Sequence, residues 1–136
     1  MHNVGAIFRT CDAAGVKQVF LCGITATPPR PQISKTALST IEHVNWRYYK
    51  STLRIVKHLK KIGIKIVALE QSARSVNYQH YHYQTPIAII LGNEIDGVSK
   101  KVLEQCHDHV EIPMKGVAKS LNVATACGIV LYRLVD

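Results

Sequence analysis

Long apolar runs are missing from this sequence. No uninterrupted run approaches the roughly 18 residues that a membrane-spanning helix requires, and the first residues do not have the layout of a signal peptide. Internal repeats, low-complexity tracts and linker-like stretches are also missing. We therefore expect residues 1–136 to form a single domain of an intracellular protein, with enough hydrophobic residues (47%) to build a core. These features do not select the compartment, and the location that we predict is the cytoplasm.

Cysteine pairs of the kind that bind metals or form redox centres are absent as well. None of the cysteines belongs to a CxxC motif, and each has apolar neighbours or lies in a helical pattern. We expect reduced thiols that pack as small hydrophobic side chains. The four residues are Cys11, Cys22, Cys106 and Cys127.

Two histidine pairs have a spacing that suits metal binding on a strand face, namely His80 with His82 and His107 with His109. No cysteine or acidic cluster completes either pair, so we expect no metal site. The rings of segment 77–84, NYQHYHYQ, also suit base stacking. An edge strand or an amphipathic loop is the interpretation that we favour for this segment.

Acidic residues are scarce relative to basic ones. Nine Asp and Glu residues stand against 17 Lys and Arg residues, which gives a net charge of +8. Seven of the basic residues lie between Arg47 and Lys65, with no acidic residue among them. A field of one sign attracts polyanions, so a nucleic acid is an expected partner. The alternative is a solvated helix face without a ligand.

Helical and strand-like patterns alternate along the chain. Glycines end two of the expected helices, and Ser51 and Ser99 cap two of them. In the helix after Ser51, the residues expected to face inward are Leu53, Val56, Leu59 and Ile62. The expected order is a helix from the Asn3 cap to Gly15, a strand in 17–24, helices in 34–44 and 51–63, strands in 64–70 and 85–94, a helix in 100–106, a strand in 109–113 and a last helix from Ser120.

This alternation predicts an α/β domain with a mostly parallel sheet covered by helices on both faces. Sites in such sheets lie at the carboxyl ends of the strands. Two of these ends carry unusual residues: LGNEIDG begins at Leu91, and PMKGVAKSLN follows Ile112. The start of the first helix, from Asn3 to Arg9, is a third candidate. A glycine at a strand end, as at Gly92, suits a ligand that approaches the backbone closely.

The segment Gly92–Ser99, GNEIDGVS, nearly fits the phosphate-binding motif GxxxxGK[ST]. Val98 stands where the motif requires lysine, so the ammonium that contacts the phosphates is missing. A nucleotide-hydrolysing P-loop protein is therefore not expected.

The start of the last helix contains an unexpected polar residue. Asn122 follows the expected cap Ser120 at a position where the helix should already bury apolar residues.

Three segments together resemble the motifs of the SpoU (TrmH-like) branch of the SPOUT RNA methyltransferases. The first is NVGAIFRTCDAAGV, in which Asn3, Gly5 and Arg9 occupy the positions of the family's Asn, Gly and Arg. The second is IAIILGNEIDGVS, and the third is VEIPMKGVAKSLNVATACGIVLY. ITATPPRPQISKTALS resembles a further family segment, which commonly has Gly where Ser39 stands. The likeness covers nearly the whole chain.

The resemblance implies a C-terminal deep trefoil knot and a homodimer with its active site near the subunit interface. It also implies transfer of a methyl group from S-adenosylmethionine to a ribose 2′-hydroxyl of RNA. We expect tRNA rather than rRNA as the substrate, because the sequence shows no appended RNA-binding domain. No metal takes part. The cofactor-binding residues that it implies are Leu91, Gly92, Ile112, Met114 and Leu121.

The catalytic and RNA-positioning residues that the resemblance implies are Asn3, Arg9, Glu94, Ser120 and Asn122. A guanidinium hardly deprotonates in proteins, so Arg9 is expected to donate hydrogen bonds, bind phosphate or stabilise the developing alkoxide. Glu94 would position the ribose or Arg9. Ser120 and Asn122 would orient Arg9 and the loops.

The front of the chain departs from the family. A strand normally precedes the Asn of the first motif, whereas only Met1 and His2 precede Asn3 here, so the first strand is expected to be missing. The alternative function is a catalytically inactive RNA-binding or assembly module with the same fold. Retention of all five implied catalytic residues argues against it.

Overall fold

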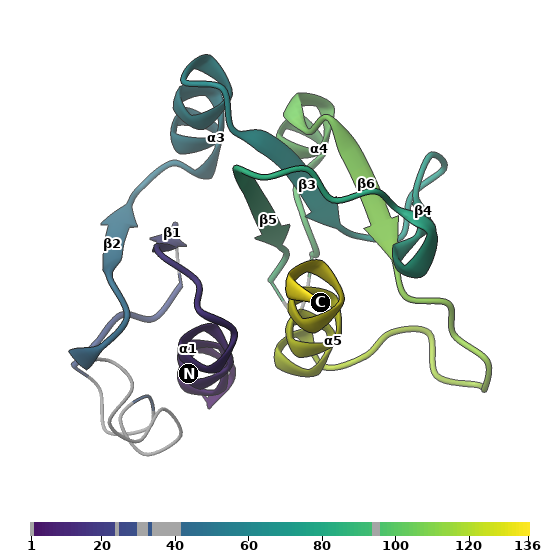
Figure 1. Ribbon diagram of the computed structural model, residues 1–136, viewed down its shortest axis with the longest axis horizontal. Coiled ribbons are helices and arrows are strands. Elements are labelled where there is room, and N and C mark those ends of the chain that lie inside the picture. Colours follow the sequence, from purple (N-terminus) through teal and green to yellow (C-terminus); the bar gives the residue numbers. More distant parts are fainter. Residues whose placement is uncertain (1, 24, 30–32, 34–41, 94–95) are drawn as a thin grey trace. The chain divides into compact units, whose positions relative to one another are not determined.

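The computed structural model describes residues 2–23, 25–29, 33, 42–93 and 96–136. They belong to two compact units, one made of Met1–Ser51 with Cys127–Asp136 and the other of Thr52–Ala126. All pairs of strands labelled in Figure 1 are parallel, which confirms the predicted α/β class with mostly parallel pairing. In the described ranges, no helix is long and apolar enough to cross a membrane. The helix predicted over 34–44 lies outside them except for its last three residues.

The first unit contains helix α1 (His2–Ala14), strands β1 (Val19–Cys22) and β2 (Trp46–Tyr49), and the greater part of helix α5 (Val123–Val135). The two strands pair from Val19 opposite Trp46 to Cys22 opposite Tyr49. Strand β1 was predicted and β2 was not. Its four residues are too few to show a period, and its pairing with β1 is not local.

Helix α1 ends as predicted and begins differently. Gly15 has a φ of 75°, and the N–H of Val16 donates to the carbonyl of Cys11 at 2.9 Å, as in a Schellman motif. The prediction that Asn3 caps the helix is wrong, because the helix already includes His2 and Asn3 lies within it. Arg9 is exposed on this helix.

Three of the four cysteines are buried, in agreement with their expected role as small hydrophobic residues. Cys11 and Cys127 share a hydrogen bond, which lowers the pKa of the Cys11 thiol and raises that of Cys127. Burial raises the pKa of the Cys106 thiol to about 11. These thiols are parts of the packed interior.

The second unit contains a four-stranded parallel sheet with the order β4-β6-β3-β5. Strand β3 (Lys65–Leu69) pairs along its length with β5 (Ile87–Leu91) and, on its other side, with β6 (Asp108–Glu111). The middle residues of β3 are fully buried, as its continuous apolar run predicts. Because the strands are parallel, the carboxyl ends of β3, β5 and β6 lie at the same edge of the sheet.

Helices α3 (Thr52–Lys61) and α4 (Lys100–Gln105) pack side by side (Figure 1). The Ser99 cap of α4 is confirmed, since its hydroxyl accepts a hydrogen bond from the Val102 N–H at 3.3 Å. Gly63, with a φ of 92°, follows the end of α3 as predicted. The prediction that Ile62 faces inward is wrong. Its side chain is 59% exposed because α3 ends at Lys61 and the chain reverses there.

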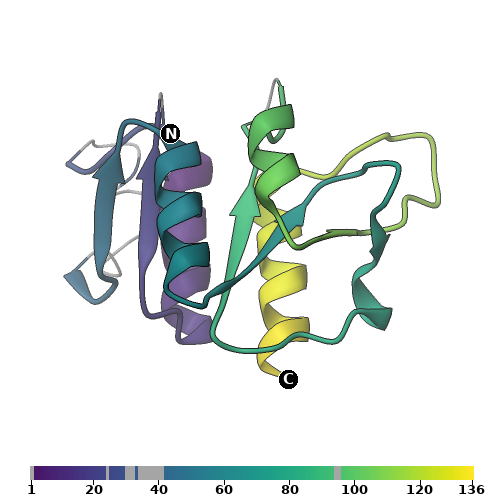
Figure 2. The same ribbon diagram turned by 90° about the horizontal axis from the view of Figure 1, so that it is seen from above.

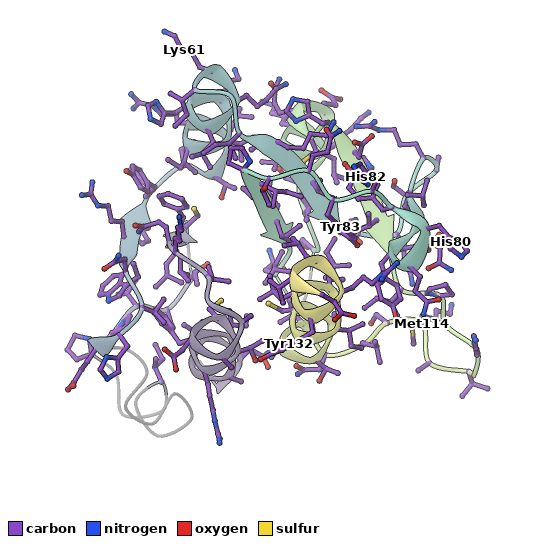
Figure 3. The ribbon with its side chains drawn as sticks, in the orientation of Figure 1. Lys61, His80, His82, Tyr83, Met114 and Tyr132 are labelled. Atoms are coloured by element: carbon purple, nitrogen blue, oxygen red, sulfur yellow. The ribbon has the colours of Figure 1, made fainter. Side chains whose placement is uncertain are left out.

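The favoured interpretation of segment 77–84 is confirmed at its start. Asn77 ends β4 (Val76–Asn77), a two-residue edge strand, and a short 3₁₀ helix, η2 (Tyr78–His80), follows. The Tyr81 hydroxyl donates a 2.6 Å hydrogen bond to the Asp108 carboxylate, and this bond is the main reason why the pKa of Asp108 is lowered. His80 and His82, labelled in Figure 3, are exposed.

Candidate functional site

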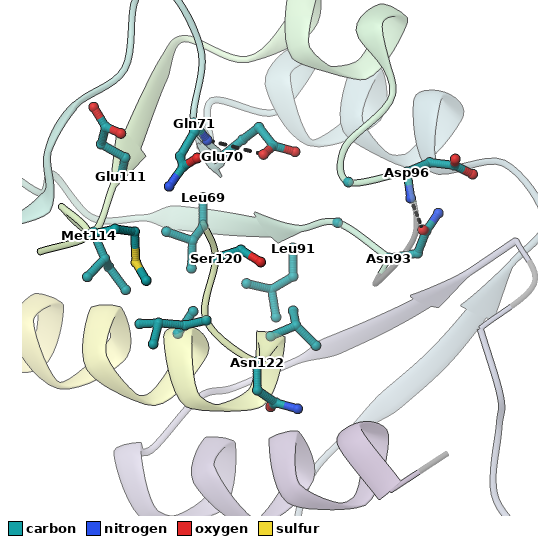
Figure 4. A pocket seen from close by; sticks show the side chains of 16 residues that line it. Leu69, Glu70, Gln71, Leu91, Asn93, Asp96, Glu111, Met114, Ser120 and Asn122 are labelled. Carbon is teal, nitrogen blue, oxygen red and sulfur yellow. Dashed lines mark hydrogen bonds between the residues drawn. The ribbon is translucent and has the colours of Figure 1, made fainter. Parts of the chain in front are cut away.

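A cavity of about 570 Å³ lies where β3, β5 and β6 end and where α5 begins (Figure 4). All of its lining residues belong to the second unit. This is the position that the parallel sheet predicts for a site. The lining comprises Leu69, Glu70, Gln71, Leu91, Gly92, Asn93, Asp96, Gly97, Glu111, Ile112, Met114, Ser120, Leu121, Asn122, Val123 and Ala126.

The structure describes residues 92, 93 and 96–98 of the loop after β5, and these residues are called the β5 loop below. The β5 loop folds back on itself: the Gly97 N–H donates to the Asn93 carbonyl at 3.1 Å, and the Asp96 N–H donates to Asn93 Oδ1 at 2.6 Å. A Cβ atom added to Gly92 would lie 2.6 Å from the Gly97 Cα. The close approach expected at Gly92 therefore comes from the loop's own backbone, and the space that Gly92 leaves is already filled.

The loop after β6, residues 112–122, is called the β6 loop below. Figure 2 shows it leaving β6 and returning to the start of α5. Met114 is half-buried, whereas Val117 is fully exposed and no atom outside the chain neighbours lies within 4 Å of a Cβ added to Gly116. This loop is therefore much more open than the β5 loop.

Asn122 is the N-cap of helix α5. Its Oδ1 accepts hydrogen bonds from the N–H groups of Ala124 at 2.9 Å and Thr125 at 3.3 Å, and its carbonyl accepts the first helical bond, from Ala126. The prediction that Ser120 caps and opens the helix is wrong, because the helix starts only at Val123. Asn122 is thus no misplaced polar residue, since it satisfies the first free N–H groups of the helix.

Seven of the residues proposed from the sequence come together at this cavity: Leu91, Gly92, Ile112, Met114, Ser120, Leu121 and Asn122. Glu94 lies outside the described residues. Asn3 and Arg9 lie on α1, in the other unit.

Two polar residues of the lining, Glu70 and Gln71, lie outside the candidate site segments that the sequence singled out. They directly follow the buried strand β3, and that position was the available signal. The Glu70 carboxylate accepts hydrogen bonds from the Val98 N–H at 2.8 Å and from the Gln71 N–H at 3.1 Å. The Gln71 side-chain amide donates to the Lys119 carbonyl at 3.1 Å.

Among the described residues, the lining carries acidic side chains and no lysine, arginine or histidine. Its acids are Glu70, Asp96 and Glu111, although the chain as a whole is strongly basic. A cavity of this charge suits a ligand with a positive charge and disfavours a triphosphate. This observation agrees with the argument from Val98 against a P-loop.

The His107/His109 pair has a structural place in the described residues. His107 Nδ1 accepts a hydrogen bond from the Ile66 N–H at 2.9 Å, and the buried His109 ring lies 2.7 Å from the Ser72 hydroxyl. Arg74, two residues after Ser72, donates to the Cys106 carbonyl at 2.8 Å. This bond connects the turn that contains Ser72 to the residues just before β6. Within the described residues, no three His, Cys, Asp or Glu side chains gather closely enough to hold a metal ion.

Comparisons with known proteins point to one family. The profile of the SpoU rRNA Methylase family matches residues 1–132. The chain is 37% identical over 134 residues to the tRNA (guanosine(18)-2′-O)-methyltransferase of Aquifex aeolicus, covering 96% of this chain and 62% of that protein. It is also 37% identical to the 23S rRNA (guanosine-2′-O-)-methyltransferase RlmB of Vibrio vulnificus, covering 98% of this chain and 54% of that protein.

Solved structures agree with the sequence matches. The TrmH/SpoU tRNA modifying enzyme of A. aeolicus superposes with a TM-score of 0.89 at 33% identity, over 98% of this chain and 68% of that chain. The AdoMet-bound rRNA methyltransferase of Sinorhizobium meliloti gives a TM-score of 0.91 at 29% identity, over 98% and 51% of the two chains. This chain spans between half and two thirds of the length of the curated relatives given above. Because the family profile matches residues 1–132, the chain belongs to the SpoU rRNA Methylase family.

Proposed function

We propose that this chain is the methyltransferase domain of an RNA ribose 2′-O-methyltransferase that uses S-adenosylmethionine. The observation that carries the proposal is the cavity, because the second and third sequence motifs meet there at the ends of parallel strands. The names of the relatives support the same reaction, since they describe tRNA and rRNA guanosine 2′-O-methyltransferases.

The residues of the cavity fit this cofactor. Apolar side chains such as Leu91, Met114 and Leu121 offer a surface for a purine ring. The cavity volume of about 570 Å³ is within the range of small-molecule pockets. The carboxylates of Glu70, Asp96 and Glu111 suit the positive sulfonium and ammonium groups of S-adenosylmethionine. Structures of family members with bound AdoMet are known from S. meliloti and Streptomyces viridochromogenes.

When bound, the cofactor supplies an activated methyl group for transfer to an oxygen nucleophile. We assign Leu91, Gly92, Ile112, Met114 and Leu121 to cofactor binding, in part through their main-chain groups. The Asn122 cap fixes the turn before α5 and so holds the neighbouring Leu121 and Ser120 in place. The chain's task at this site is positioning, which is a large part of the acceleration of a displacement reaction.

Arg9 is proposed to donate hydrogen bonds to the ribose hydroxyl or a neighbouring phosphate, because a guanidinium carries several N–H donors and no acceptor. Asn3 and Glu94 are assigned the positioning roles that the family resemblance implies. We expect Arg9→Ala to abolish methyl transfer while the affinity for S-adenosylmethionine stays within a few-fold of wild type. Arg9→Lys keeps the charge but loses the planar set of donors, so it should restore only a small part of the activity.

Transfer RNA is the substrate class that we favour, with guanosine 2′-O-methylation of tRNA and of rRNA both represented among the relatives. The basic residues between Arg47 and Lys65 are proposed to contact the phosphate backbone. The proposal includes a single domain over residues 1–136 with a deep trefoil knot, a homodimer and a cytoplasmic location.

The test is incorporation of tritiated methyl groups from S-adenosylmethionine into bulk tRNA and rRNA, followed by mass spectrometry to map the methylated nucleotide. Calorimetry with S-adenosylmethionine runs in parallel. We expect binding of the cofactor and label in a ribose 2′-O-methyl group of tRNA. Binding without label in any RNA would favour the inactive RNA-binding module, and label in a base would contradict the assigned reaction.

A further inference from the structure

The residues that follow β3 lie between the two loops of the cavity. In the sheet order β4-β6-β3-β5, strand β3 has β5 on one side and β6 on the other. Glu70 and Gln71, called the Glu70–Gln71 pair below, come directly after β3 and line the cavity (Figure 4). A side chain at this point can therefore reach the β5 loop or the β6 loop.

Glu70 contacts the β5 loop. One carboxylate oxygen accepts the Val98 N–H at 2.8 Å, and a Cβ atom added to Gly97 would collide with that same oxygen. Gly97 has a φ of 68°, a conformation that favours glycine, so the loop passes the carboxylate without a side chain between them. An ionised acceptor makes a stronger hydrogen bond than a neutral one.

Gln71 contacts the β6 loop. Its side-chain amide donates to the carbonyl of Lys119 at 3.1 Å, and Lys119 directly precedes Ser120 and Leu121 of the cavity lining. The N–H of Gln71 donates to the second carboxylate oxygen of Glu70 at 3.1 Å. The two contacts are therefore linked, because the Glu70 carboxylate that holds one loop also orients the residue that holds the other.

We propose that Glu70 and Gln71 are positioning residues that fix the β5 loop and the β6 loop relative to each other and so set the affinity for the cofactor. This inference rests on the proposed function, in which Gly92 belongs to one loop and Met114 and Leu121 belong to the other. A site whose loops are held in place before binding loses less conformational entropy on binding. Loss of either contact leaves the residues that touch the cofactor present but poorly arranged.

The experiment compares four variants with wild type: Glu70→Ala, Glu70→Gln, Gln71→Met and the double variant Glu70→Ala/Gln71→Met. Glu104→Ala and Gln84→Met are matched controls, since both residues are exposed and do not line the cavity. Two quantities are measured: the dissociation constant of S-adenosylmethionine by calorimetry, and hydrogen exchange of the two loops in the protein without cofactor.

Gln71→Met is expected to raise the dissociation constant about fivefold, the equivalent of one neutral hydrogen bond. Glu70→Ala is expected to raise it about tenfold or more, because it removes a charged acceptor of two N–H groups. Glu70→Gln keeps one acceptor oxygen and should lie between Glu70→Ala and wild type. Exchange should become faster in the β5 loop with Glu70→Ala and in the β6 loop with Gln71→Met, and both controls should match wild type.

Binding by Gln71→Met and Glu70→Gln within twofold of wild type would overturn the proposal, even if exchange in the loops became faster, because the contacts would then be only structural. Unchanged exchange in both loops would also overturn it. Should wild type fail to bind S-adenosylmethionine, the proposed function fails, and the exchange rates of the cofactor-free variants still decide whether the pair holds the two loops. Gln71→Met changes an exposed side chain, so it tests the proposal even if Glu70→Ala does not fold.

Discussion

The β5 loop and the β6 loop border the same cavity, but they are held in place by different contacts. The β5 loop is compact: its own backbone and the Asn93 side chain bond across it, and Gly92 packs against the backbone of Gly97 and Val98. The β6 loop is mostly exposed. It is held by the Gln71 bond to Lys119 and by the cap at Asn122.

The difference indicates two tasks. The β5 loop is held by bonds within the loop and by the Glu70 carboxylate, so it acts as a rigid wall of the site. An open loop held mainly near one end can adjust to what binds, and its exposed Lys115 and Lys119 are available to a polyanion. We expect substitutions in the β5 loop to act first on stability and those in the β6 loop to act first on binding.

Gly92→Ala should have the largest effect. The added Cβ would lie 2.5 Å from the Val98 nitrogen and 2.6 Å from the Gly97 Cα, and backbone atoms cannot move aside cheaply. We expect a loss of about 2–3 kcal/mol of unfolding free energy, typical of overpacking, together with weaker binding of S-adenosylmethionine. Urea unfolding and calorimetry measure the two effects. Gly116→Ala is the control, with its stability unchanged within about 0.5 kcal/mol because its site is open.

Asn122→Ala should have the next effect, because it removes the cap from α5. The expected cost is about 1 kcal/mol of unfolding free energy, which Asn122→Asp should largely restore. Ser120→Ala distinguishes the role of Ser120 from that of Asn122. It should leave thermal unfolding nearly unchanged and still reduce methyl transfer. A loss of stability with Ser120→Ala equal to that with Asn122→Ala would contradict the assignment of the cap.

Asn93→Ala removes the side-chain acceptor of the Asp96 N–H in the β5 loop. We expect a loss of about 0.5–1.5 kcal/mol in urea unfolding, the usual contribution of one hydrogen bond. Asn93→Asp keeps an acceptor oxygen and should unfold close to wild type. If both variants unfold like wild type, the β5 loop does not depend on this contact.

Val117→Ser should have the smallest effect, since Val117 is fully exposed in the middle of the β6 loop sequence. Its unfolding free energy should stay within about 0.5 kcal/mol of wild type, as for most surface substitutions. A clear loss of stability would show that the β6 loop is packed after all and would remove the contrast between the two loops.

Local sequence patterns were enough to predict much of the fold. The ends of α1 and α3 at glycines, the Ser99 cap and the buried run of β3 depend on neighbours in the chain, so the sequence predicts them. Strand β2 escaped prediction because its four residues are held by pairing with β1, more than 20 residues earlier. Asn122 was misinterpreted because a cap is defined by where the helix actually starts, and Ser120 fits the same rule in sequence.

The sequence by itself determined the family, the motifs at the ends of β5 and β6, and the basic charge, because these depend only on residue types and spacing. The tertiary structure determined which residues lie in space between these two motifs. Parallel pairing places the end of β3 between the ends of β5 and β6, so Glu70 bonds to Val98, 28 residues later, and Gln71 bonds to Lys119, 48 residues later. Contacts over such separations arise from the packing of the sheet, and no local pattern of residues encodes them.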